Sequence, residues 1–158
     1  MQPGDGDAVL AESGAIVDYI VHRHAGGRLA LSPDDPGYAR YVYWLHFAEG
    51  SLMSLLLIVL VLSRVPEAAA SPVTARMRER MNQMLSFVDK ELAADPWFAG
   101  AAFTAADVMM VFPFTTLRNF LAYDLAPYAN IAAYLTRIAA RPAYQKAMSL
   151  AGPKKKYV

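Results

Sequence analysis

Apolar residues recur at intervals of three and four along most of the chain, which is the spacing of one face of an α-helix. The clearest case follows Ser71-Pro72, a helix cap and a first-turn proline, and continues to Leu92. The same spacing predicts helices over residues 15–21, 38 to about 65, 105 to about 121 and 131–138, and a short last helix through Met148. The pattern therefore predicts an all-α fold, a bundle of about six helices.

The first 24 residues depart from this pattern. Asp5-Gly6 is typical of a hairpin turn, and Ala8–Ala11 after it has the pattern of a short strand leading into the first helix. A single strand has no ladder partner and cannot bury itself. We therefore divide the chain into a strand-and-helix segment, 1–24, a turn-rich linker, 25–36, and an all-helical domain, 37–158.

Composition excludes several classes of function. The 158 residues make one domain by length, with 56% hydrophobic and 18% charged residues. A net charge of +1 gives no strong attraction to nucleic acid. The absence of cysteine rules out disulfides, zinc thiolate sites and a cysteine nucleophile within this sequence. The acidic, turn-rich start is unlike a signal peptide, which favours a cytoplasmic location.

One apolar run, Leu52–Leu62, invites comparison with a membrane span. A spanning helix needs about 20 consecutive apolar residues, and this run is shorter and bracketed by Glu49 and Arg64. We therefore expect no membrane span, and interpret the run as a buried helix or one half-buried in a subunit interface.

Thr104 and Asp107 stand three apart, directly before an apolar run. At this spacing the Thr104 hydroxyl can accept the N–H of residue 107 while the Asp107 carboxylate accepts the N–H of residue 104. Phe103 precedes the cap and is placed to pack on Val108 as a hydrophobic staple. The pattern predicts a well-capped core helix, which Pro113 kinks or interrupts.

Three stretches resemble one family, the glutathione transferases. W-F-A-G followed by F-T-A-A-D resembles the start of the central buried helix in that family's helical C-terminal domain. L-A-E-S-G-A-I-V-D-Y-I resembles the last strand-to-helix corner of its thioredoxin-like domain, and W-L-H-F-A-E-G-S-L-M a bacterial and fungal subgroup. The resemblance implies a helical bundle of the glutathione transferase C-terminal type, with residues 1–24 as the end of a thioredoxin-like domain. The sequence lacks the region in which the family carries its catalytic Ser, Tyr or Cys. We therefore expect an amino-terminally truncated form or a naturally short relative.

The resemblance also implies site residues. Glu12 and Ser13 would bind the γ-glutamyl end of glutathione, because a carboxylate pairs with its ammonium and a hydroxyl binds its carboxylate. The alternative is that either residue merely caps the helix. His46 would reach the glutathione of a partner subunit, unless it is an ordinary core or interface histidine. The electrophile pocket would include Tyr41, Met53 and Phe112.

Function follows from the same resemblance. The complete protein would conjugate glutathione, its substrate, to small apolar electrophiles as a homodimer, an activity of the detoxification type. We expect no metal cofactor, since His22 and His24 lie on different helix faces without a carboxylate pair. The catalytic donor is assigned to no residue of this sequence, so we expect little conjugation by this chain alone. The alternative is a non-catalytic helical interaction module of the same fold.

Overall fold

The computed structural model describes residues 9–151, and within that range the chain is helical with irregular connections. The elements are α1 (Ser13–Tyr19), the π-helical η1 (Ile20–His24), α2 (Tyr38–Phe47), the π-helical η2 (Ala48–Met53), α3 (Ser54–Arg64), α4 (Pro66–Ala69), α5 (Pro72–Glu91), α6 (Ala105–Phe114), the 3₁₀-helical η3 (Thr116–Asn119), α7 (Ala129–Ala139) and α8 (Pro142–Leu150). The predicted all-α bundle is confirmed for this range.

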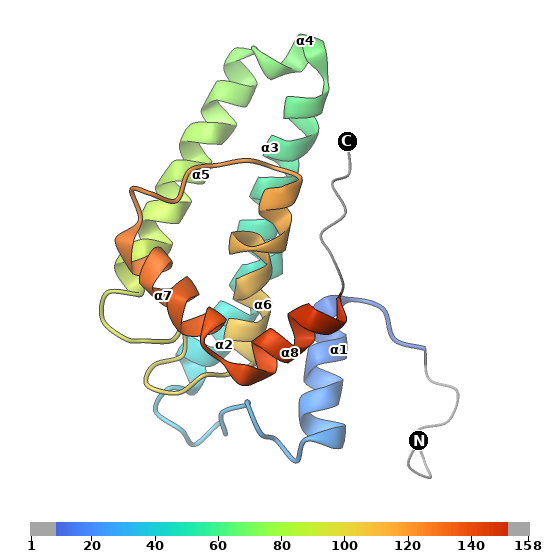
Figure 1. Cartoon of the computed structure of the whole chain (residues 1–158), viewed down its shortest axis with the longest axis vertical. Coiled ribbons are helices and arrows are strands. Elements are labelled where there is room, and N and C mark those ends of the chain that lie inside the picture. The colour runs from blue at the N-terminus through green and yellow to red at the C-terminus, as the bar shows by residue number, and fades with distance from the viewer. Residues whose placement is uncertain (1–8, 152–158) are drawn as a thin grey trace.

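The helices surround α6, as Figure 1 shows. Helix α2 packs along α6, and α1 also contacts it, whereas α3 and α5 pair with each other. The α3–α5 arm, with α4 at its tip, extends to one end of the molecule, and α1, α2 and α8 gather at the other (Figure 1). This arrangement brings the start of α1 next to the junction of α2 and η2.

The core gathers where α2, α5, α6 and α7 meet. Its largest fully buried side chains are aromatic: Trp44, Phe98, Phe114 and Tyr134. The Phe98 ring lies 4.8 Å from Trp44 and 5.0 Å from Tyr134, measured between centroids, so one aromatic side chain joins α2 to α7. Helix α6 is apolar on almost every side, and most of its residues are buried, whereas Val108 and Phe112 stay exposed.

Residues Tyr38–Arg64 form one continuous helix of 27 residues. By length and composition alone this helix is long and apolar enough to cross a membrane, although the apolar run inside it is shorter. Its inner side is packed in the core through Trp44, Leu52 and Leu56. The sequence-based expectation of no membrane span therefore stays a prediction.

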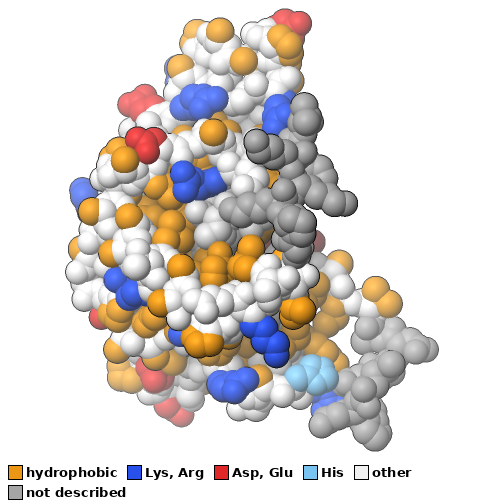
Figure 2. Space-filling view, viewed as in Figure 1, with side chains coloured by type: hydrophobic (Ala, Val, Ile, Leu, Met, Phe, Trp, Pro, Cys, Tyr) orange, Lys and Arg blue, Asp and Glu red, His pale blue; other side chains and the backbone are white. Residues whose placement is uncertain are grey.

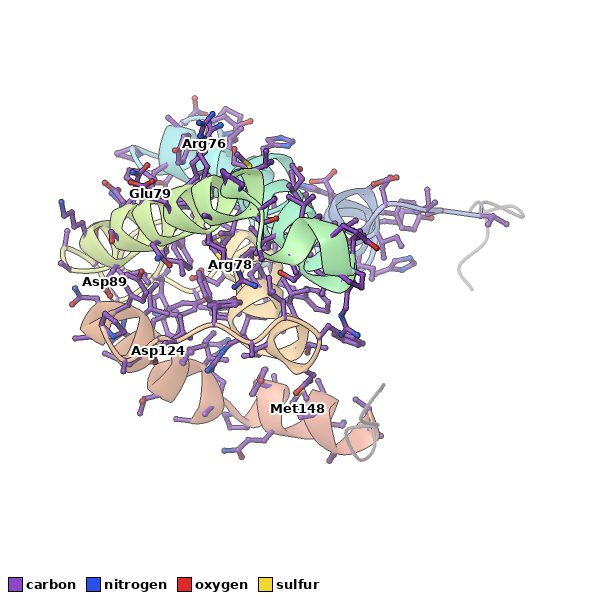
Figure 3. The ribbon with its side chains drawn as sticks, turned by 90° about the horizontal axis from the view of Figure 1, so that it is seen from above. Arg76, Arg78, Glu79, Asp89, Asp124 and Met148 are labelled. Carbon is purple, nitrogen blue, oxygen red and sulfur yellow. The ribbon has the colours of Figure 1, made fainter. Side chains whose placement is uncertain are left out.

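Helix α5 begins and ends with side-chain contacts. The Ser71 hydroxyl accepts the N–H of Thr74 at 3.2 Å, as the Ser71-Pro72 signal predicts. Near its other end Asp89 faces α7 (Figure 3), and its carboxylate accepts the backbone N–H groups of Asn130 and Ile131 at 2.8 and 2.9 Å. The first turn of α7 is therefore capped by a residue of another helix.

Charged side chains of α5 point in different directions. Figure 3 shows Arg76 and Glu79 on one side of the helix and Arg78 on the other. Arg78 donates a hydrogen bond to the Ser63 hydroxyl of α3 at 2.7 Å, so it links α5 to α3. On the face drawn in Figure 2, the Lys and Arg side chains of the described residues are scattered among uncharged atoms.

The structure corrects two element predictions. Residues 9–11 of the predicted strand are irregular, because no described segment lies beside them as a ladder partner, and the rest lies outside the described residues. The predicted long helix is confirmed as Tyr38–Arg64, with η2 as a π-helical stretch inside it. The capped helix ends at Phe114 rather than near Leu121, because Pro113 has no N–H and its ring crowds the preceding turn. The proposed boundaries at 24 and 36 stay a prediction.

Candidate functional site

Helix α1 begins at the Glu12-Ser13 pair, beside α6 and the long helix. Neither side chain caps α1, so the alternative interpretation of these two residues as simple helix caps gains no support. Instead, the Ser13 hydroxyl donates a hydrogen bond to Glu49 Oε1 at 2.9 Å. Gly14 lies beside α6, since a Cβ at that position would be 4.0 Å from Met109 Cε, an ordinary van der Waals contact. The start of α1 is thereby joined to both α6 and η2.

A groove of about 590 Å³ opens between α1 and the long helix. It brings Glu12 and His46 together within one chain, as two of the residues that line it. The other lining residues are Gly14, Ala15, Asp18, Leu45, Glu49, Gly50 and Met109. Its lining thus combines carboxylates with small and apolar residues.

A smaller pocket of about 270 Å³ adjoins the groove. It is lined by Ser13, Val17, Glu49, Val108, Met109 and Phe112, so four of its six side chains are apolar. Glu49 and Met109 line both cavities and form the wall between them. An acidic groove next to an apolar pocket can hold a ligand with a charged end and an apolar end.

Negative charge dominates the groove. Glu12, Asp18 and Glu49 contribute three carboxylates, all on exposed residues. His22 lies 3.4 Å from Asp18, an ion pair when the imidazole is protonated. The groove therefore favours a cationic group such as an ammonium. Among the described residues, no three His, Cys, Asp or Glu side chains gather in a way that could hold a metal ion.

The structure places the predicted site residues in two groups. Glu12, Ser13, His46 and Phe112 line the two adjoining cavities. Tyr41 and Met53, at 4% and 7% exposure, belong to the hydrophobic core and line neither cavity. Burial, followed by the nearby charges of Asp18 and Tyr38, raises the pKa of the Tyr41 hydroxyl. Both residues therefore lie on the inner side of the long helix.

Sequence reasoning missed the residues of the dividing wall. Glu49 is part of the quoted W-L-H-F-A-E-G segment, but nothing local marks it as facing the start of α1. A π-helical turn widens the helix at Ala48–Met53 and changes which side chains follow one another on a face. The Ser54 hydroxyl donates to the Glu49 carbonyl at 2.9 Å, a bond that spans five residues within this turn.

The predicted capping box is present at the start of α6. Asp107 Oδ2 accepts the backbone N–H of Thr104 at 2.9 Å, and Oδ1 accepts that of Phe98 at 3.1 Å. Burial raises the pKa of the Asp107 carboxyl, although the hydrogen bonds from Thr104 and Phe98 act to lower it. The Phe103 ring contacts Trp97 and lies 3.6 Å from the Arg141 guanidinium, so its packing on Val108 stays a prediction.

A second groove, of about 620 Å³, lies on the other side of the long helix, against α5. It is lined by Tyr43, Phe47, Ser51, Ser54, Leu55, Ile58, Met77, Arg80, Gln83, Met84 and Phe87. Tyr43, Ile58 and Phe87 are exposed by 49%, 47% and 38%. This groove is more apolar than a typical exposed surface, and its large side chains lack cover in the single chain.

Comparison with known proteins gives a consistent result. The family model described as "Glutathione S-transferase, C-terminal domain" matches residues 52–142. Glutathione S-transferase 3 of Zea mays is 32% identical over 154 residues, which cover 92% of this chain and 68% of the maize protein. Glutathione S-transferase 3 of Schizosaccharomyces pombe is 30% identical over 154 residues, 88% of this chain and 62% of that protein.

Solved structures agree with these relatives. A glutathione S-transferase from Actinobacillus pleuropneumoniae matches with a TM-score of 0.78 at 32% identity, over 90% of this chain and 64% of that one. A sphingomonad glutathione S-transferase complexed with glutathione matches with a TM-score of 0.71 at 29% identity, over 92% of this chain and 69% of that one. The chain thus spans between 62% and 69% of the length of these four proteins.

Proposed function

Because this chain belongs to the glutathione S-transferase family, we propose that it forms the helical part of an enzyme that conjugates glutathione to small apolar electrophiles. The observation that carries this proposal is the pair of adjoining cavities with a common wall of Glu49 and Met109. Glutathione has a charged γ-glutamyl end and a thiol to which apolar groups are attached. A charged groove beside an apolar pocket matches both parts.

In this proposal Glu12 and Ser13 bind the γ-glutamyl end. The Glu12 carboxylate pairs with the ammonium, and the Ser13 hydroxyl binds the carboxylate on the same carbon. His46 lines the same groove as Glu12, so it is placed to contact the peptide from the long helix of the same chain. The family resemblance alone suggested contact with a partner's glutathione, and the groove offers a role within one subunit.

The electrophile would occupy the apolar pocket. Phe112, 41% exposed, presents its ring there together with Val17 and Val108. Burying an apolar substituent against these side chains supplies about 25 cal/mol for each Å² removed from water. The pocket therefore favours apolar electrophiles without selecting one chemical type.

Conjugation also requires a donor that holds the sulfur of glutathione as a thiolate, since the thiolate is the nucleophile. None of the residues that line the two cavities is assigned this role. Accordingly, the 158 residues taken alone are proposed to bind the peptide without efficient catalysis.

A homodimer, in the cytoplasm, is part of the same proposal. The second groove exposes Tyr43, Ile58 and Phe87 along the long helix and α5. A second copy of the chain that packs on this face would cover them. The alternative function, a helical interaction module, uses the same face for a different protein.

Isothermal titration with glutathione and with S-hexylglutathione tests the proposed function. We expect both to bind, and S-hexylglutathione to bind several-fold more tightly because its alkyl chain enters the apolar pocket. Phe112→Ser should remove most of that advantage, whereas Val73→Ser, at an exposed valine of α5, should not. Binding of neither compound would overturn the proposal.

A further inference from the structure

The hydrogen bond between Ser13 and Glu49 bears on how the proposed site selects its ligand. We propose that Glu49 competes with the ligand's carboxylate for the Ser13 hydroxyl, so that Glu49 limits the affinity for γ-glutamyl peptides. This inference rests on the proposed function, since it concerns the residue assigned to bind the γ-glutamyl end. It assigns Glu49 a role as a specificity-determining residue.

Ser13 has one hydroxyl proton to donate, and it is already engaged. Its Oγ donates to Glu49 Oε1 at 2.9 Å, which is ordinary hydrogen-bond geometry. A hydroxyl that donates to Glu49 cannot donate the same proton to an incoming carboxylate. The ligand's carboxylate therefore gains this bond only after Glu49 has given it up.

The bond is exchangeable because both partners are exposed to solvent. A hydrogen bond on the surface replaces bonds to water and contributes little net stability. The backbone of Glu49 has its own hydrogen bond, since the Ser54 hydroxyl donates to its carbonyl at 2.9 Å. The carboxylate can thus move away while the helix stays as it is.

Charge adds to this competition. A ligand carboxylate at Ser13 lies beside Glu49, which lines both cavities, and next to the groove that holds Glu12 and Asp18. Among the residues that line the groove, His46 is the one that can carry a positive charge. His22 lies near Asp18 and offsets part of its charge only when protonated. Like charges weaken binding of the carboxylate and favour the ammonium of the same ligand. Glu49 differs from the other two acids because it opposes the carboxylate through charge and through the occupied hydroxyl.

The test compares variants by titration calorimetry with two peptides. Glutathione carries both the ammonium and the α-carboxylate, and 4-aminobutyryl-cysteinyl-glycine lacks only the α-carboxylate. We expect Glu49→Ala to bind glutathione roughly threefold or more tightly than the unchanged chain, and Glu49→Gln to gain less, because its amide oxygen can still accept the Ser13 hydroxyl. Neither variant should bind the 4-aminobutyryl peptide more tightly.

Matched variants separate the hydroxyl from general charge. Asp18→Asn removes one charge from the same groove without touching the Ser13 bond, and should give a smaller gain. In the Ser13→Ala background, Glu49→Ala should lose most of its effect. Thermal unfolding followed by circular dichroism shows that each variant folds.

Each outcome decides between the two proposals. If the unchanged chain binds glutathione but the Glu49 variants bind it equally or less tightly, the inference fails and the proposed function stands. An equal gain from Asp18→Asn also overturns the inference, because charge alone would then suffice. If neither the unchanged chain nor any variant binds glutathione, both the inference and the proposed function are overturned. A gain specific to Glu49 that depends on Ser13 supports both.

Discussion

Asp107 accepts a hydrogen bond from the backbone N–H of Phe98 at 3.1 Å, nine residues earlier in the chain. The other oxygen of the same carboxylate accepts the N–H of Thr104 at 2.9 Å. The residue that caps α6 therefore also holds the loop that inserts Phe98 between Trp44 and Tyr134. One buried carboxylate thus joins the start of the central helix to the aromatic core.

Replacing the capping residues should destabilise the fold unequally. Thr104→Ala removes one cap partner and should cost about 1 kcal/mol of unfolding free energy. Asp107→Ala leaves the buried N–H groups of Thr104 and Phe98 without their acceptor, and should cost about 1–3 kcal/mol. Urea unfolding of both variants measures the difference. Changes no larger than those of a surface substitution would show that the box is dispensable.

The Asp107 carboxyl should also make stability depend on pH. Burial raises its folded pKa above the ordinary value of an aspartate, despite the hydrogen bonds that act to lower it. The folded chain then binds more protons than the unfolded chain between these two pKa values, so the contribution of Asp107 to stability falls as pH rises through that window. We expect the unfolding free energy of the unchanged chain to fall relative to that of Asp107→Asn as the pH rises through this window. The measurement runs from pH 3.5 upward at about half-unit steps. A contribution that instead grows with pH would contradict the raised pKa.

Asp89 should matter more than its partial exposure suggests. Its carboxylate accepts the N–H groups of Asn130 and Ile131 and the Asn130 side-chain amide at 2.8, 2.9 and 3.0 Å. Asp89→Ala leaves the first turn of α7 uncapped and should cost about 1–2 kcal/mol. Asp124→Ala is the control, because that carboxylate accepts the N–H of Ala126 within one loop. Equal losses in chemical denaturation would refute the special role of Asp89.

The proposed homodimer predicts a position-dependent effect of charge. Ile58 is 47% exposed and lines the second groove, so Ile58→Glu should dissociate a dimer without unfolding the chain. Val73→Glu places the same charge on an exposed valine, 58% accessible, that does not line this groove. Light scattering after size exclusion measures both masses. A monomeric unchanged chain would rule out the dimer at the concentration used.

The purified 158-residue protein by itself should show little turnover of glutathione with 1-chloro-2,4-dinitrobenzene. The physical reason is that no residue lining the cavities is assigned to stabilise the thiolate. The change in absorbance that follows conjugation, corrected for the uncatalysed reaction, is the measurement. Turnover clearly above that background would show that a residue of this chain performs the missing role.

Much of the fold could be predicted because it is encoded locally. The spacing of apolar residues after Ser71 predicted α5, and the Thr104–Asp107 pair predicted the start of α6. The predicted resemblance to glutathione transferases is confirmed by the family match. Each of these signals lies within one or two turns of helix, where neighbours in sequence are also neighbours in space.

The candidate site was only partly predictable. Glu12, Ser13, His46 and Phe112 lie in the adjoining cavities, but Tyr41 and Met53 lie in the core. The last two were placed by their position along the long helix. The π-helical turn at Ala48–Met53 determines which side of that helix faces α1. No local sequence pattern predicts this turn.

The sequence by itself determined the helices, their capped ends and the family, since these depend on periodicity and on contacts a few residues apart. Tertiary structure alone decided that Ser13 donates to Glu49, 36 residues away, and that Asp89 of α5 caps α7. It also decided that the Leu29 carbonyl of the linker accepts the first N–H of α6, from Ala105, at 2.7 Å. Such partners are chosen by how whole helices pack against one another, because only close packing brings residues so distant in sequence within hydrogen-bond reach.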